Sequence, residues 1–315
     1  MQPPPHAGDA LGWAQRIRAA LELAETGMLA DGELPPASVR FVLYEQPLLE
    51  LCSGAVARHE ILLRMVAEDG EHIAPMAFLP TAEQVGLVQA IDAWVIGGAI
   101  DLIARQALRG ERLQLDVNIS GASVTDPELL AMVERELALA EIDPTCLTFE
   151  ITETAAIADI ELAQQFAQRL GELGCGFALD DFGAGFGSFF YLKHIPFDTL
   201  KIDGEFIRGL VHCERDQIMV KAIAGVARQL GTETVAEFVT DDATRELVHS
   251  YGIHYAQGYG IGRPRPITAT WPGAFAQPRA AGPAITLPPV AGVALSGAAA
   301  VVRPSAGVHS VPAPA

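Results

Sequence analysis

The sequence has few cysteines and no cysteine motif. Its four cysteines, Cys52, Cys146, Cys175 and Cys213, form no C-x-x-C pair. Three of them lie in or beside apolar segments, where a free cysteine behaves as a small buried hydrophobic residue. This usage indicates a reducing compartment and argues against a disulfide framework.

Positive charge is scarce as well. The 315 residues include 21 Lys and Arg against 39 Asp and Glu, which gives a formal net charge of -18. Such a surface repels long nucleic acids and anionic membranes, so neither is expected as a partner. A small anionic ligand stays compatible with this charge where metal ions or local Lys and Arg side chains offset the field.

Long apolar runs are also absent. Apolar residues make up 50% of the chain, which is enough for a large core. No uninterrupted apolar stretch reaches the roughly 20 residues of a membrane helix. The proline-rich residues 1–5 lack the charged region and apolar run of a signal peptide. We therefore predict a cytoplasmic protein with no membrane span.

Composition divides the chain into three segments. Residues 1–36 carry an amphipathic helical pattern over 11–23 and end in a Gly/Pro-rich break, which predicts a short helical lead-in. Residues 37–271 alternate strand-like and helical patterns, as one barrel domain would. Residues 272–315 are rich in Pro, Ala, Gly and Val and nearly lack charge. They predict a disordered tail or linker, with a weak membrane or partner contact as the alternative.

Strand-like runs of β-branched and apolar residues recur through the central segment. The predicted strands are residues 40–49, 57–65, 113–120, 147–152, 176–181, 199–202, 233–239 and 255–259. Their alternation with helical patterns predicts an α/β fold with a mainly parallel sheet. Eight strands in roughly 220 residues favour a closed (β/α)8 barrel. An open doubly wound sheet is the alternative, which the lack of G-x-G-x-x-G after the first strand disfavours.

Helix-end signals fall between these strands. Residues 125–128, Thr-Asp-Pro-Glu, have capping-box spacing with proline just inside the start, so a helix is expected to begin there. A helical pattern over 218–230 ends at Gly231, and Gly174 and Gly252 likewise precede strands. Glycine at a helix end accepts the left-handed conformation that closes the last turn.

Two adjacent carboxylates, Asp180 and Asp181, follow the apolar run 177–179 and precede Gly183 and Gly185. At about 4 Å and an effective dielectric constant of about 20, two like charges repel by roughly 4 kcal/mol. Such a pair is either solvated at a turn or neutralised by a cation. The other strand ends favour the cation.

Polar residues lie within or at the ends of the other predicted strands. They are Glu60, Asn118, Glu150, Lys201, Asp203, Glu237 and Gln257. Because the carboxyl ends of barrel strands meet at one face, we expect these side chains to gather there. Carboxylate and carboxamide oxygens suit Mg²⁺ or Mn²⁺ better than Zn²⁺. Two such cations clamp the oxygens of a phosphoryl displacement, a lysine orients water and a glutamate accepts its proton. The residues therefore indicate metal-dependent phosphoester hydrolysis.

From about residue 42 to 266 the chain resembles an EAL domain, the bacterial phosphodiesterase of cyclic di-GMP. The matching stretches are Gln46-Pro47, Glu60-Ile61-Leu62-Leu63-Arg64, Phe78-Leu79-Pro80-Thr81-Ala82-Glu83, Val117-Asn118-Ile119-Ser120, Glu150-Ile151-Thr152-Glu153, Asp180-Asp181-Phe182-Gly183-Ala184-Gly185, Leu200-Lys201-Ile202-Asp203, Val235-Ala236-Glu237 and Gln257-Gly258-Tyr259. The resemblance implies a modified (β/α)8 barrel whose first strand runs antiparallel to the others. It also implies linearisation of cyclic di-GMP to pGpG at a two-metal site holding Mg²⁺ or Mn²⁺, and a homodimer.

The resemblance further implies roles for individual residues. By motif, the first metal would be held by Glu60, Asn118, Glu150 and Asp180, and the second by Asp181. Water would be positioned and activated by Lys201 and Glu237, and a substrate phosphate would meet Arg64. Glu153 would support the loop after residues 176–181, which contributes to dimerisation in the family, while Asp203 and Gln257 would complete the pocket. No regulatory protein partner is identified by these motifs.

The chain departs from the family pattern at four positions. Ile61 replaces the signature alanine and should face the helices, and Met65 replaces an aromatic residue. Phe238 stands at a glycine position and should point away from the lumen into the helix layer. Thr240 replaces a glutamate near the site. Two alternatives therefore stand beside the active enzyme. One is a weakly active or inactive cyclic di-GMP receptor or protein-interaction module, and the other is hydrolysis of another phosphoester.

Overall fold

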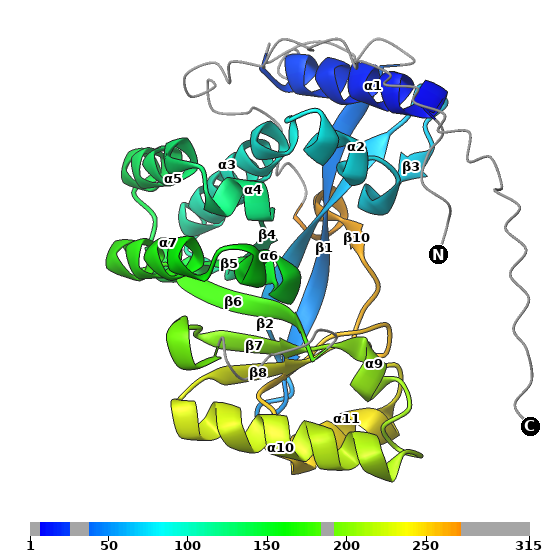
Figure 1. Ribbon diagram of the computed structural model, residues 1–315, viewed down its shortest axis with the longest axis vertical. Coiled ribbons are helices and arrows are strands. Elements are labelled where there is room, and N and C mark those ends of the chain that lie inside the picture. The colour runs from blue at the N-terminus through cyan, green and yellow to red at the C-terminus, as the bar shows by residue number, and fades with distance from the viewer. Residues whose placement is uncertain (1–6, 26–37, 184–191, 272–315) are drawn as a thin grey trace, which may run out of the picture.

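The computed structural model of the chain describes residues 7–25, 38–183 and 192–271 (Figure 1). The predicted tail at 272–315 lies outside the described residues. Within the described part, no helix is both long and apolar enough to cross a membrane.

Eight strands of the described chain close into a barrel. They are β1 (Arg40–Glu50), β2 (Val56–Val66), β4 (Leu115–Asn118), β5 (Leu147–Thr152), β6 (Gly176–Phe182), β7 (Thr199–Ile202), β8 (Glu233–Ala236) and β9 (Tyr255–Ala256). Neighbours from β2 through β9 pair in parallel, and β1 closes the barrel antiparallel to both β2 and β9. The predicted barrel and its antiparallel first strand are confirmed, and the open-sheet alternative is wrong.

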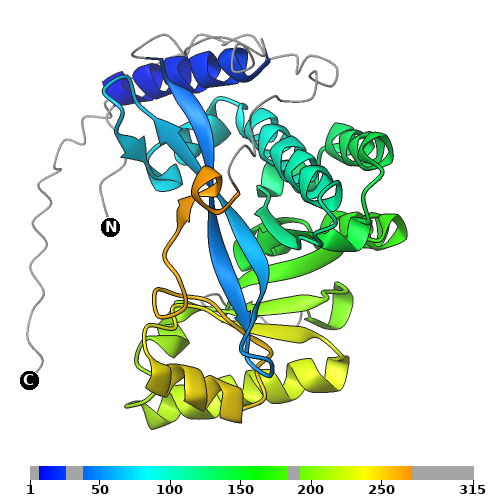
Figure 2. The same ribbon diagram turned by 180° about the vertical axis from the view of Figure 1, so that it is seen from behind.

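The β1–β2 hairpin is much longer than the other barrel strands and extends beyond the barrel (Figures 1 and 2). Its far end pairs with β3 (His72–Ile73), and β10 (Arg265–Pro266) pairs with the middle of β1. Helix α1 (Ala7–Glu25) packs across this far end through Ile17 and Leu21, which are fully buried. The predicted lead-in helix is therefore part of the folded unit.

Helices surround the barrel between the strands. They are α2 (Leu79–Gln84), α3 (Val88–Ala107), α4 (Gly121–Val124), α5 (Pro127–Ala140), α6 (Glu153–Ala158), α7 (Ile160–Leu173), α9 (Gly204–Ile207), α10 (Glu214–Leu230), α11 (Asp242–Ser250) and α12 (Ile267–Thr270), with 3-10 turns η1 (Pro75–Ala77) and η2 (Pro144–Cys146). Helices α3, α5 and α7 cover one side, while α10 and α11 cover another (Figure 1). Gly174 and Gly231 end α7 and α10 with φ of 86° and 75°, the left-handed conformation expected of them.

Side-chain alternation gives the barrel two different interiors. Ile61, Leu63 and Met65 of β2 point outward into the main core between strands and helices. Arg58 and Glu60 alternate with them and point into the lumen. The lumen is therefore polar, although a small apolar cluster inside it is separate from the main core.

One helix start is confirmed and two strand bounds need correction. Residues 125–128 open α5, with Asp126 as the cap, which accepts a hydrogen bond from the Glu128 amide at 2.9 Å. The segment 113–120 contains only the shorter strand β4. Strand β8 ends at Ala236 because Phe238 has a φ of 51°, which no extended strand accommodates.

The cysteines and the last strand also differ from expectation. Only Cys146 and Cys175 are buried, whereas Cys213 is half-buried and Cys52 is exposed. Strand β9 is two residues long because Gly258 turns the chain against the loop after β8. A Cβ on Gly258 would lie 2.4 Å from the Val239 amide nitrogen, so only glycine fits this close approach.

Candidate active site

The ammonium group of Lys201 lies at the centre of the lumen cluster. Its side chain is 1% exposed, and β7 carries it into a ring of carboxylates. The distance from Nζ is 2.8 Å to Glu150, 3.1 Å to Glu237, 3.2 Å to Asp180 and 3.5 Å to Glu60. These four acids come from β2, β5, β6 and the end of β8, so the lysine joins distant parts of the barrel.

Glu60 is held by two carboxamides. Asn118 donates to its Oε1 at 2.6 Å, and Gln257 donates to its Oε2 at 2.5 Å. Gln257 also donates to Gln46 at 3.4 Å, and Gln46 donates in turn to the carbonyl of Gly262 at 2.9 Å. Gln46 belongs to a stretch that matches the family, but the motifs predict no site role for it. The structure pairs Gln46 on β1 with Glu60 on β2, so both side chains face the same interior.

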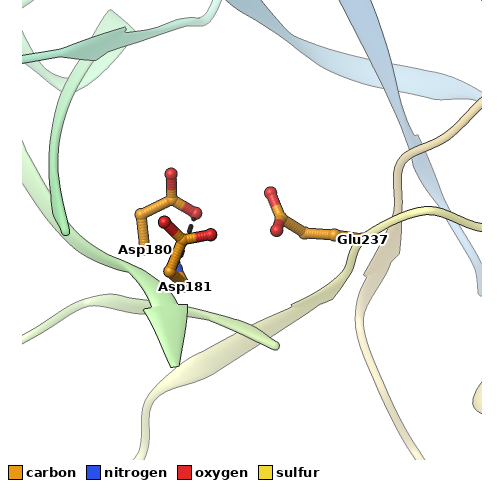
Figure 3. A group of neighbouring side chains, drawn as sticks. All are labelled: Asp180, Asp181 and Glu237. Carbon is orange, nitrogen blue, oxygen red and sulfur yellow. Dashed lines mark hydrogen bonds between the residues drawn. The ribbon is translucent and has the colours of Figure 1, made fainter. Parts of the chain in front are cut away.

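Asp180, Asp181 and Glu237 form an acidic trio at the rim. One carboxylate oxygen of each lies within 4.8 Å of the others. Consecutive strand residues normally point to opposite faces, but Asp181 has a φ of 56°. This left-handed turn brings its carboxylate round beside that of Asp180, and both face Glu237 (Figure 3). The Asp181 amide also donates to the Asp180 side chain at 3.0 Å.

The pKa values of this cluster reflect burial and crowding. Burial and the neighbouring carboxylates of Asp180 and Asp203 raise the pKa of Asp181 to about 6. Burial raises the pKa of Glu150 and Glu237 well above the ordinary value, despite the opposing effect of Lys201. Burial alone would lower the pKa of Lys201, but the surrounding carboxylates outweigh it, so its pKa is raised and the amine stays protonated.

The residues present fit divalent cations. Six carboxyl groups lie in or beside this cluster: Glu60, Glu150, Asp180, Asp181, Asp203 and Glu237. One ammonium group faces them, which leaves a formal excess of five negative charges. In addition, Oε1 of Glu150 is buried without a hydrogen-bond partner. Buried carboxylates need positive charge or hydrogen-bond donors to offset the cost of their burial. A donor set made only of oxygen atoms is the kind that Mg²⁺ and Mn²⁺ bind.

Two further predicted residues lie around the cluster. Glu153 is 3% exposed and accepts a hydrogen bond from the Gly183 amide at 3.2 Å, at the start of the loop after β6. Asp203 caps α9 by accepting from the Glu205 amide at 2.6 Å, and its carboxyl group also contacts Asp181.

Arg64 is directed elsewhere. Its guanidinium donates to the Leu63 carbonyl at 2.6 Å and lies 5.4 Å from the ring centre of Tyr44. Because Arg64 is four residues beyond Glu60 on β2, it faces the same side of the strand. Leu62 stands between them on that face, and the guanidinium of Arg64 lies against Tyr44 of β1.

The departures from the family pattern lie in two different environments. Ile61 is 2% exposed within the main core, as expected. Phe238 is 46% exposed, so it is not buried within the helix layer, although its ring lies against Gly204, the first residue of α9, as a side chain pointing away from the lumen would. Its left-handed backbone turns the ring over Gly204 and beneath Arg208, whose guanidinium carbon lies 4.0 Å from the ring centre. Thr240 is exposed and donates to Asp241 at 3.2 Å.

A (β/α)8-type barrel with an antiparallel first strand and acidic residues at its strand ends defines a narrow class of protein. The model of the EAL domain family matches residues 33–264. The chain belongs to the EAL family, and the resemblance inferred from its motifs is confirmed.

Named relatives are similar over most of the chain. Cyclic di-GMP phosphodiesterase PdeF of Escherichia coli strain K12 is 40% identical over 230 residues, which are 73% of this chain and 30% of PdeF. Cyclic di-GMP phosphodiesterase PdeB of Shewanella oneidensis is 36% identical over 82% of this chain and 28% of PdeB. The chain thus spans about a third of the length of the curated relatives it matches.

Solved structures show the same fold. The PaMucR phosphodiesterase in complex with c-di-GMP is 31% identical, with a TM-score of 0.73 over 82% of this chain and 99% of that one. The FimX EAL domain from Pseudomonas aeruginosa bound to c-di-GMP is 28% identical, with a TM-score of 0.71 over 87% of this chain and 100% of that one.

Proposed function

We propose that the chain hydrolyses cyclic di-GMP to pGpG in a metal-dependent reaction. The observation that carries the proposal is the convergence of Lys201 with four carboxylates from separate strands, beside the acidic trio at the rim. The names of PdeF, PdeB and PaMucR support cyclic di-GMP as the substrate.

Two Mg²⁺ or Mn²⁺ ions complete the proposed site. The residues that would hold the first are Glu60, Asn118, Glu150 and Asp180, and Asp181 would hold the second. When bound, such ions supply a water of lowered pKa and offset the charge of the phosphate. The excess of carboxylates over Lys201 and the raised pKa of Asp181 support cation binding at this place.

The protein groups have separate tasks in this reaction. Lys201, kept protonated by its neighbours, donates hydrogen bonds that orient the attacking water or a phosphate oxygen. Glu237 accepts the proton of that water as the general base, and burial raises the pKa of its carboxyl group above the ordinary value. Arg64 meets a substrate phosphate at the outer end of β2, and Asp203 and Gln257 complete the pocket.

The proposal extends to the whole chain. Residues 1–36 form the lead-in, 37–271 the catalytic barrel and 272–315 a tail. The protein acts in the cytoplasm as a homodimer. The loop that follows β6 contributes to the dimer contact, and Glu153 supports this loop.

A cyclic di-GMP receptor with little or no turnover is the second candidate. It is favoured by Thr240, which lies exposed where the family has a glutamate, and by the bulky Phe238 one residue after the proposed base. The structure of the FimX EAL domain bound to c-di-GMP supports nucleotide binding by this fold in general.

One assay separates the two candidates. The purified full chain is incubated with cyclic di-GMP and Mg²⁺ or Mn²⁺, and pGpG is followed by chromatography. Product that disappears in Glu60→Ala but persists in Glu68→Ala, a control acid in an exposed ion pair, supports the enzyme. Binding without product supports the receptor. Failure to bind contradicts both.

A further inference from the structure

A second polar cluster crosses the lumen on the amino-terminal side of the Lys201 cluster. Arg58 of β2 is 5% exposed and donates to Asp116 at 2.7 and 3.1 Å, to Thr148 at 2.9 Å, to Thr199 at 3.3 Å and to Glu233 at 3.5 Å. We call these five residues the lower layer. One guanidinium thereby ties β2 to β4, β5, β7 and β8.

The lower layer is related to the site by a constant offset along the chain. Four of its members precede a site residue by two positions: Arg58 and Glu60, Asp116 and Asn118, Thr148 and Glu150, Thr199 and Lys201. Side chains two apart on a strand point to the same face, about 7 Å from each other along it. Strands β2, β4, β5 and β7 therefore each carry a lower-layer residue and, two residues later on the same face, one of the site residues Glu60, Asn118, Glu150 and Lys201.

Strand β6 leaves space where the other strands place polar groups. Ala178 and Gly176 stand two and four residues before Asp180, on the same face. A Cβ on Gly176 would lie 2.7 Å from Oγ1 of Thr148. Small residues on this strand thus make room for the hydrogen-bonded groups around the guanidinium.

We propose that Arg58 is a positioning residue that fixes the mutual spacing of Glu60, Asn118, Glu150 and Lys201, and so sets the affinity of the site for its metal ions. The proposal rests on the function proposed above. The planar guanidinium presents a rigid fork of donors, and a buried charge keeps its partners because leaving one unpaired is costly. A change of register in β2, β4, β5 or β7 would break a hydrogen bond of Arg58 and would at the same time displace the site residue on that strand.

The test removes the two buried charges of the lower layer, Arg58 and Asp116, at once and keeps the half-exposed Glu233. Arg58→Met/Asp116→Asn leaves no unpaired charge buried, so the barrel is expected to fold, which a melting curve checks. A matched control is Arg105→Met/Asp101→Asn, which deletes the 2.6 Å ion pair on α3 outside the lumen. Mn²⁺ affinity is measured by electron paramagnetic resonance without nucleotide, and kcat and KM are measured with cyclic di-GMP.

We expect the lower-layer variant to bind Mn²⁺ about 10-fold more weakly and to lose about 10-fold in kcat, as is typical when an outer partner of a metal ligand is removed. KM should stay within about twofold, because the nucleotide contacts lie above the lower layer. The α3 variant should bind Mn²⁺ like the wild type. If the double variant does not fold, Arg58→Lys replaces it, because lysine keeps the positive charge but lacks the planar set of guanidinium donors. Its loss of Mn²⁺ affinity should be in the same direction but smaller.

Unchanged Mn²⁺ affinity in a folded lower-layer variant would overturn the positioning role while leaving the phosphodiesterase proposal standing. An equal loss in the α3 variant would also overturn it, since the effect would then be one of general stability. If the wild type binds Mn²⁺ but yields no pGpG, the proposed reaction fails and the Mn²⁺ comparison still decides the role of Arg58. A wild type that binds no Mn²⁺ contradicts both.

Discussion

The two polar layers of the barrel lumen lie two residues apart on the same strands but differ in charge balance. In the lower layer, the buried charges of Arg58 and Asp116 cancel, and Glu233 is 46% exposed. Around Lys201, one ammonium faces an excess of carboxylates. The layer with balanced charge stabilises the barrel and positions the strands, whereas the layer with excess negative charge can bind cations. The same backbone pattern thus serves two purposes, and the balance of charge separates them.

The largest expected effect lies in the unbalanced layer. Glu237→Gln keeps the size of the side chain but removes the proposed base, so kcat for cyclic di-GMP should fall by about 10² to 10⁴-fold. Single-turnover formation of pGpG measures the change. Glu246→Gln on the exposed face of α11 serves as the control. A rate within threefold of wild type for Glu237→Gln would remove Glu237 from the mechanism.

In the balanced layer the largest effect should be on stability. Arg58→Leu leaves Asp116 buried and unpaired, which should lower the free energy of unfolding by about 3–5 kcal/mol. Urea denaturation followed by circular dichroism measures it. Arg58→Met/Asp116→Asn should recover most of this loss. If the single variant were as stable as wild type, the ion pair at 2.7 Å would not be a structural element of the lumen.

Removing one acid from the rim should raise the free energy of unfolding, whereas removing Arg58 should lower it. Asp181→Asn relieves repulsion in the metal-free protein, and because Asp181 keeps contact with solvent we expect a gain of no more than about 1 kcal/mol, or roughly 2–4 °C in Tm. Calorimetry in chelator at pH 7.5 measures the gain.

The pH dependence of that gain follows from the raised pKa of Asp181. Its pKa of about 6 exceeds the ordinary 3.8, so between these values the folded state binds more protons than the unfolded state. Stability of the metal-free wild type therefore falls as pH rises through this window. The advantage of Asp181→Asn should be full above pH 6 and shrink towards pH 4. A gain that grew on acidification would contradict the charge account.

The smallest effect is expected at Phe238. Phe238→Gly releases a left-handed backbone that costs a non-glycine residue about 1–2 kcal/mol, but it also loses the contact with Arg208, worth about 0.5–1 kcal/mol. The net change in unfolding free energy should stay near or below about 1 kcal/mol. Phe238→Ala loses the contact without relieving the backbone, so it should be less stable than Phe238→Gly. The reverse order would show that the backbone at this position is not strained.

Much of the fold could be predicted from the sequence because barrel strands and their partners have a strong period. The bounds of β5 and β7 match the expected 147–152 and 199–202, since both strands are buried apolar runs with clear ends. Strands β8 and β9 were expected to be longer. Their ends depend on the left-handed turn at Phe238 and on the close packing of Gly258 against Val239, which are tertiary features that no local pattern carries.

The site shows the same division. The gathering of Glu60, Glu150 and Lys201 follows from strand ends meeting at one face of a barrel. Two features of the site cannot be predicted from the sequence. The rotation of Asp181 towards Glu237 needs a backbone conformation unusual for aspartate. The role of Arg58 depends on hydrogen bonds to residues on four other strands, which are distant in the sequence and follow no local pattern.

The central claim is that the unbalanced carboxylate layer is a metal-dependent catalytic centre for cyclic di-GMP. The most direct test is a comparison of pGpG formation by the full chain in Mn²⁺ and in chelator, with Glu60→Ala alongside. We predict product in Mn²⁺, none in chelator and none from Glu60→Ala, whose carboxylate lies 3.5 Å from Lys201. Cyclic di-GMP that is bound but stays uncleaved in Mn²⁺, or product that forms equally well with Glu60→Ala, would contradict it.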